Sequence, residues 1–150
     1  MKLEEIYNLL DNLSPFSFQE KWDNAGLLVG SLDDEIENVY IRIDLDEELV
    51  LNVKENSLII THHPLIFTGL KKINYDTYSS KLLRELIKKN ISLISMHTNI
   101  DKSHLNKYFI ENILGFKIIN TNEQGATLVF YFEMSAKHFY KSFCISDYCC

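Results

Sequence analysis

The chain has 150 residues, of which 46% are hydrophobic, and its formal net charge is −6. This length supplies one hydrophobic core and is short for two. No Lys/Arg-rich run is present, so binding of nucleic acid by phosphate neutralisation is not expected. No run reaches the roughly 18 to 20 apolar residues of a membrane span. The N-terminus also lacks a signal-peptide core, and we therefore expect a cytoplasmic protein with no membrane contact.

The first 61 residues predict helices and strands in alternation. Apolar residues at helical spacing predict an amphipathic helix over residues 2–13, which Pro15 ends. Alternating apolar and polar side chains predict a strand over residues 38–45. The segment 46–56 has acidic residues in its first turn and predicts a short helix. The apolar run 57–61 has the length of a strand.

The next predicted element is a helix over residues 79–90, which Ser79 or Ser80 can cap. Two lysines near its end suit the negative end of the helix dipole. Its predicted apolar face comprises Leu82, Leu83, Leu86 and Ile87.

The remaining elements complete an α/β pattern. Residues 91–96 predict a strand, and residues 105–115 predict a helix that Gly115 closes. Residues 116–119 and 126–134 predict two final strands. Alternation of this kind predicts a single domain with a mixed, centrally parallel sheet flanked by helices. The cysteines lie near the C-terminus without C-x-x-C spacing, and no role is expected for Cys144, Cys149 and Cys150.

Potential ligands follow two of the predicted strands. His62 and His63 come directly after one strand, and His97 and Asp101 follow the next. A right-handed crossover makes these two strands parallel, so their carboxyl ends share one edge of the sheet. Ligands of open α/β sheets bind at this edge. The topology is therefore expected to bring the three histidines and the carboxylate together.

This set of side chains suits zinc, iron, manganese or nickel. A single histidine at a strand end is usually structural, but four converging ligands favour metal binding. Adjacent histidines on an extended chain point in opposite directions, so His62 and His63 can each hold a different ion only if the chain turns there. Asp101 can then bridge the two ions. Such a two-metal site activates water for hydrolysis.

Two other polar segments lie near predicted elements. Asp44 ends a predicted strand, and it either lies on the same rim or caps the helix that follows. Asp23 and Asn24 precede an apolar run whose glycines lack the G-x-G-x-x-G spacing of a nucleotide fingerprint. They predict a turn, with Trp22 packed beside it.

Four motifs in this order resemble a known family. WDNAGLLVG at 22–30, a strand ending in Asp44, ITHHPLIF at 60–67 and HTNID at 97–101 are similar to the NIF-three-like proteins. These proteins have a dinuclear metal centre and are often named type 2 GTP cyclohydrolase I homologues. The resemblance covers roughly residues 1–118.

The resemblance implies an α/β protein that assembles as a toroidal homohexamer and holds two divalent ions per subunit. By position, His62 and His63 match metal ligands, and Asp101 matches the bridging ligand. His97 matches a histidine that lies beside the site or binds more weakly. Some relatives are reported as GTP cyclohydrolases, which implies a metal-dependent hydrolase acting on a small molecule; no catalytic residue is assigned.

The chain departs from the family in its ligand set. The family's last two ligands form an H-x-x-x-E motif near the C-terminus, whereas here His138 is followed four residues later by Ser142. His104 lies where relatives tend to carry glycine. The chain thus resembles the N-terminal half of a longer protein, and fewer than two ions are possible. A non-catalytic metal-binding or assembly module with protein partners is therefore the alternative to a hydrolase.

Overall fold

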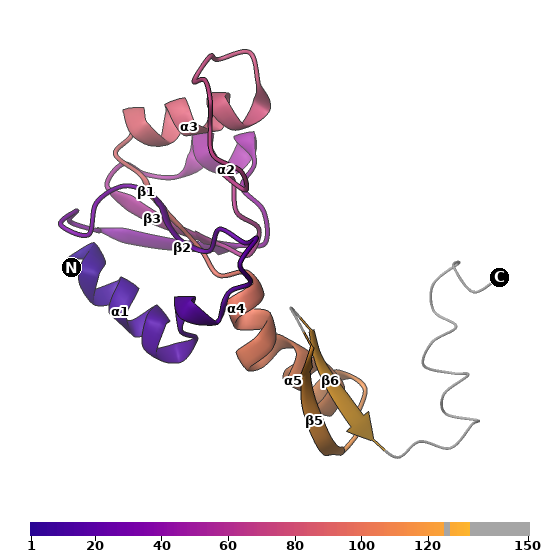
Figure 1. The fold of residues 1–150 in the computed structure, drawn as a ribbon. Helices are drawn as coiled ribbons and strands as arrows, with labels where there is room; N and C mark the ends of the chain where they lie inside the picture. The colour runs from indigo at the N-terminus through magenta and orange to yellow at the C-terminus, as the bar shows by residue number, and fades with distance from the viewer. Residues whose placement is uncertain (125–126, 133–150) are drawn as a thin grey trace. The chain divides into compact units, whose positions relative to one another are not determined.

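The computed structural model describes residues 1–124 and 127–132 (Figure 1). The chain divides after Ile100 into two compact units. The first unit contains α1 (Leu3–Leu13), η1 (Phe16–Phe18), β1 (Gly26–Val29), β2 (Asn38–Arg42), α2 (Glu47–Asn52), β3 (Ser57–Thr61), α3 (Tyr78–Lys88), β4 (Ser92–Ser95) and α4 (Thr98–Ile100).

The first unit is built on a four-stranded sheet with the order β1-β4-β3-β2. Strands β2, β3 and β4 are parallel, and β1 runs antiparallel to β4. This arrangement confirms the predicted mixed sheet with a parallel centre. Helices α2 and α3 connect the parallel strands, as crossovers between parallel strands require. Thr61, the last residue of β3, pairs with Ser95 at the end of β4, so the two strands end at the same edge.

Helices cover the sheet on both faces. Figure 1 shows α1 on one side and α2 with α3 on the other. Ile59 and Leu93 belong to the core beneath α2 and α3, whereas Leu58 and Ile94 pack in the core beneath α1. Every residue of β3 is buried, which explains why this strand is a continuous apolar run rather than an alternating one.

Strand β1 was not predicted from the sequence. It has four residues, begins at Gly26 and is followed by Gly30, and the φ angles of these two glycines are +117° and +105°. Glycines with positive φ are typical of turns. The sequence predicts a turn at Asp23 and Asn24 and no element for the apolar run that follows. The strand forms because β4 offers it an antiparallel partner, and that partner lies more than 60 residues further along the sequence.

Helix α3 differs from its prediction at two points. Its N-cap is Thr77, so the prediction of Ser79 or Ser80 as the cap was wrong. Ser80 is buried within the first turn, where its Oγ accepts a hydrogen bond from Thr77 Oγ1 at 2.9 Å. Ile87 was also wrongly placed on the buried face, because its side chain is 61% exposed.

The strand predicted over residues 38–45 ends at Arg42, and the helix that follows is capped by Asp46 rather than Asp44. The Asp46 carboxylate accepts a hydrogen bond from Leu49 N at 2.7 Å. This bond satisfies one of the amides that have no partner within the helix.

Asp46→Ala is therefore expected to lower the free energy of unfolding by about 1 kcal/mol, which is the usual effect of removing an N-cap. Urea denaturation followed by circular dichroism measures this loss. Glu55→Ala is the matched control, because Glu55 is an exposed acid just beyond the same helix. Its effect should stay within about 0.5 kcal/mol. Equal effects of the two substitutions would contradict the assigned cap.

The described part of the second unit contains a helical segment followed by a hairpin. Its elements are η2 (Asp101–Leu105), α5 (Asn106–Tyr108), η3 (Phe109–Ile113), β5 (Ile118–Gln124) and β6 (Thr127–Phe132). Strands β5 and β6 pair antiparallel. The helix predicted over residues 105–115 is confirmed, and Gly115 follows it with a φ of +70°.

Some sequence predictions lie outside the described residues. They concern the three cysteines, His138 and the end of the strand predicted over residues 126–134. Within the described ranges, no helix combines the length and the apolar character needed to cross a bilayer.

Candidate metal centre

The backbone turns sharply where β3 ends. The amide groups of His62 and His63 both donate to the carbonyl oxygen of Ile43, at 3.1 and 3.0 Å. Thr61 Oγ1 donates to the carbonyl oxygen of His63 at 2.9 Å. Because of this turn, the two adjacent imidazoles lie near each other, with ring centroids 4.8 Å apart. An extended chain would have directed them to opposite sides.

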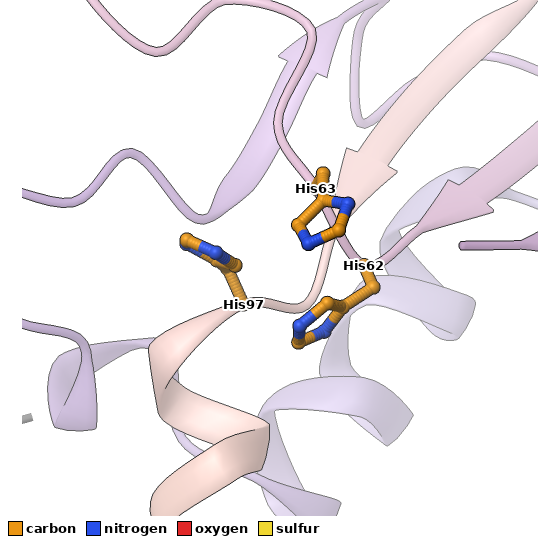
Figure 2. A group of neighbouring side chains, drawn as sticks. All are labelled: His62, His63 and His97. Carbon is orange, nitrogen blue, oxygen red and sulfur yellow. The ribbon is translucent and has the colours of Figure 1, made fainter. Parts of the chain in front are cut away.

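A third imidazole, that of His97, joins this pair from the end of the neighbouring strand β4. Its ring centroid lies 5.1 Å from that of His62 and 5.7 Å from that of His63. One ring nitrogen from each residue lies within 4.8 Å of the other two. Figure 2 shows the three rings gathered around one space. Parallel β3 and β4 therefore bring the three histidines together, at the edge where ligands of α/β sheets bind.

Each of the three histidines uses its Nδ1 in a hydrogen bond to an oxygen. The acceptors are the carbonyl of Met96 at 2.9 Å for His62, Asp44 Oδ1 at 2.7 Å for His63 and Asp23 Oδ1 at 2.8 Å for His97. Carbonyl and carboxylate oxygens accept hydrogen bonds, so Nδ1 must carry the proton in each ring. In a neutral imidazole the lone pair then belongs to Nε2.

This donor set fits a divalent first-row metal. Histidines that bind metal almost always donate their other ring N–H to a carboxylate or a carbonyl, which is the pattern of all three rings here. Imidazole suits zinc, iron and nickel. Ring nitrogens within 4.8 Å of one another could hold one ion together after small ring rotations, or could be divided between two ions.

Asp23 is the most buried polar group of the site. Its carboxylate is fully buried and also accepts hydrogen bonds from Thr98 N at 3.0 Å, Thr98 Oγ1 and Asn24 N at 2.7 Å. Burial raises the pKa of the Asp23 carboxyl, but the hydrogen bonds from Thr98, His97 and Asn24 outweigh it and hold the pKa below its ordinary value. Asp23 is therefore an ionised acceptor. The sequence predicted only a turn here and gave no sign of its bond to His97, 74 residues away.

Two aromatic rings flank His97. The centroids of Trp22 and Phe67 lie 6.5 and 6.3 Å from that of His97, and 6.0 Å from each other. Trp22 is 55% exposed and Phe67 is 46% exposed. Asn24 Nδ2 donates to the carbonyl of Ile66 and so ties the two aromatic segments together. The histidines thus have an apolar wall beside them that is open to solvent.

The remaining predicted site residues are placed as follows. Asp44 follows the end of β2 and accepts the hydrogen bond of His63, so it lies on the rim. Asp101 begins η2 and belongs to the second unit, whereas the histidine geometry belongs to the first. His104 also belongs to the second unit; it is exposed, and its Nδ1 lies 2.8 Å from Ser103 Oγ.

Comparison with known proteins extends this description. A family model described as Duf34/NIF3 (NGG1p interacting factor 3) matches residues 1–145. The chain is 63% identical over 118 residues to the "GTP cyclohydrolase 1 type 2 homolog" of Campylobacter jejuni, covering 79% of this chain and 49% of that protein. It is 50% identical over 127 residues to the "GTP cyclohydrolase 1 type 2" of Helicobacter pylori, covering 85% and 51%. The chain therefore spans about half the length of these curated relatives.

Solved structures share the same fold. Protein SA1388 of Staphylococcus aureus matches with a TM-score of 0.69 and 38% identity, over 81% of this chain and 41% of that one. Reduced HcgD from Methanocaldococcus jannaschii matches with a TM-score of 0.74 and 28% identity, over 94% and 58%.

Proposed function

The chain belongs to the Duf34/NIF3 family, and on this premise we propose that it binds divalent metal ions at the histidine cluster and takes part in metal-dependent hydrolysis. One observation carries the proposal. All three imidazoles donate Nδ1–H to an oxygen, so all three carry the lone pair on Nε2, within one cluster. This pattern, combined with ring nitrogens within 4.8 Å of one another, suits a metal centre.

Each residue of the candidate metal centre has a separate role in this proposal. Activation of water and polarisation of the substrate are the chemistry that bound divalent ions supply. His62 and His63 hold the ions, and Asp44 keeps the His63 ring in place through Nδ1. His97 would be a further ligand through Nε2, or would accept a proton there beside the other two histidines. Asp101 is proposed as the bridging ligand from the family resemblance and from its place four residues after His97.

The proposed substrate is a small molecule with a planar ring. Two relatives carry the name GTP cyclohydrolase 1 type 2, and on this basis we propose a nucleotide as the substrate of this chain. Trp22 and Phe67 support it, because half-exposed aromatic rings beside His97 offer apolar faces on which a planar ring can stack.

Self-association is the second proposed function, in the form of the ring-shaped homohexamer that the family resemblance implies. Strand β2 supports it, because β2 lies at an edge of the first unit's sheet. Val39, Ile41 and Ile43 on and beside this strand are 48%, 76% and 66% exposed. An exposed apolar sheet edge is a common site of chain association. A non-catalytic metal-binding or assembly module would meet its protein partners through this surface and would show no turnover.

Metal titration of the chain tests the first proposal. Metal-free protein is dialysed against Zn²⁺, Mn²⁺, Fe²⁺ or Ni²⁺, and the bound metal is measured by elemental analysis. We expect one or two ions per chain, and hydrolysis of GTP by the loaded protein. A chain that binds no metal overturns the proposal, and one that binds metal without turnover supports the assembly module instead. Where the loaded protein hydrolyses GTP, His63→Ala should abolish that turnover but leave the mass of the protein in solution unchanged.

A further inference from the structure

The His97 ring makes a hydrogen bond unlike those of the other two histidines. Its partner Asp23 has a side chain with 0% exposure, and His97 itself is only 16% exposed. In the corresponding pair, His63 and Asp44 are 52% and 66% exposed, so water competes for their hydrogen bond. The hydrogen bond between His97 and Asp23 is therefore shielded from water, whereas water can replace the hydrogen bond between His63 and Asp44.

Asp23 is also fixed in place by other donors. Oδ2 accepts from the backbone and the hydroxyl of Thr98, and Oδ1 accepts from Asn24 N as well as from His97 Nδ1. A carboxylate has about four acceptor positions, and these four hydrogen bonds occupy them. The Asp23 carboxylate can therefore neither rotate away from His97 nor donate to it.

We propose that Asp23 is the positioning residue of the candidate metal centre: it holds His97 in the Nδ1–H tautomer, so that Nε2 keeps its lone pair beside His62 and His63. This inference rests on the proposed metal site, which it deepens. A negative acceptor at Nδ1 also makes Nε2 a stronger electron donor. Asp23 thus links the Trp22–Asn24 segment to the ligand set, a role that a turn residue would not have.

A purely structural role for Asp23 is the rival interpretation. The two roles separate in Asp23→Asn, which keeps the shape of the side chain. The asparagine oxygen keeps both donors of Thr98 only if the NH2 group faces His97, and the hydrogen bond from Asn24 N is then lost. An N–H donor at that position requires His97 Nδ1 to become the acceptor, and the ring proton then moves to Nε2. The lone pair is lost from the nitrogen that binds the metal.

The matched control is Asp34→Asn. Asp34 Oδ2 accepts from a backbone amide, Ser31 N at 2.7 Å, and from a hydroxyl, Ser92 Oγ at 2.9 Å. The substitution is the same and the donors are of the same kinds as those of Thr98. The hydrogen bonds of Asp34 include none to a histidine.

The test is NMR of 15N-histidine-labelled, metal-free protein, together with Zn²⁺ affinity by calorimetry. We expect the Nδ1–H form of His97 in the unsubstituted chain and in Asp34→Asn, and the Nε2–H form in Asp23→Asn. Zn²⁺ affinity should fall about 10–100-fold in Asp23→Asn, which is the usual effect of losing such a partner, and should stay unchanged in Asp34→Asn.

Two outcomes would overturn the inference. One is an Nε2–H form of His97 in the unsubstituted chain, a result that holds even if Asp23→Asn does not fold. The other is an equal loss of affinity in Asp23→Asn and Asp34→Asn. Absence of Zn²⁺ binding by the unsubstituted chain is a separate result, because it refutes the proposed function while the tautomer of His97 still tests the positioning by Asp23.

Discussion

Ile59→Ala is expected to lower the free energy of unfolding by about 2–5 kcal/mol, the range for truncating a large buried aliphatic side chain. Ile59 lies in β3, at the centre of the sheet, and is 0% exposed. Its side chain packs in the core beneath α2 and α3. The close-packed side chains around it can relax only partly into the cavity that the truncation leaves. Urea denaturation followed by circular dichroism measures the loss.

Ile41→Ala is the matched control, because it makes the same change on the adjacent strand β2. Ile41 is 76% exposed, so its truncation removes little buried surface. We expect a change within about 0.5 kcal/mol. Denaturation at two protein concentrations separates this value from any contribution of self-association. Similar losses for Ile59 and Ile41 would show that β3 is not the centre of the core.

His62→Ala is expected to weaken Zn²⁺ binding by at least about 100-fold. Removal of an outer hydrogen-bonding partner already weakens binding 10–100-fold, and a ligand contributes more than its partner does. His62 is the histidine closest to both others, with ring centroids 4.8 and 5.1 Å away. Calorimetric titration of metal-free protein with Zn²⁺ measures the affinity. Trp22, the single tryptophan, lies beside His97 and gives a second, fluorescent readout.

His104→Ala is the control for this experiment. It removes the same side chain from an exposed position whose ring lies next to Ser103. We expect its Zn²⁺ affinity and its circular dichroism spectrum to match those of the unsubstituted chain. If His104→Ala weakened binding as much as His62→Ala, the metal would bind at a set of histidines that includes His104. The cluster of His62, His63 and His97 would then lose its proposed role.

The sequence predicted the elements whose patterns are local. The amphipathic repeat of α1, the buried run of β3 and the crossover through α3 to β4 are all contained in short segments, and the structure confirms each of them. Strand β1 has no such pattern. Its four residues begin with Gly26, are followed by Gly30, and become a strand only by pairing with β4, so no window of local sequence could reveal it.

For the site, the sequence alone determined that two strands end in histidines and that a parallel crossover carries those ends to one edge. This holds because the hand of the crossover and the direction of the strands follow from backbone geometry. The tertiary structure decided the rest: the turn after β3, bonded to the carbonyl oxygen of Ile43, that brings His62 and His63 together, and the oxygen that faces each Nδ1. Asp23 and His97 are 74 residues apart in the sequence, and the path of the folded chain brings them within hydrogen-bonding distance. A hydrogen bond over such a distance leaves no periodic trace in the sequence, so only the folded chain shows which carboxylate accepts the hydrogen bond of that ring.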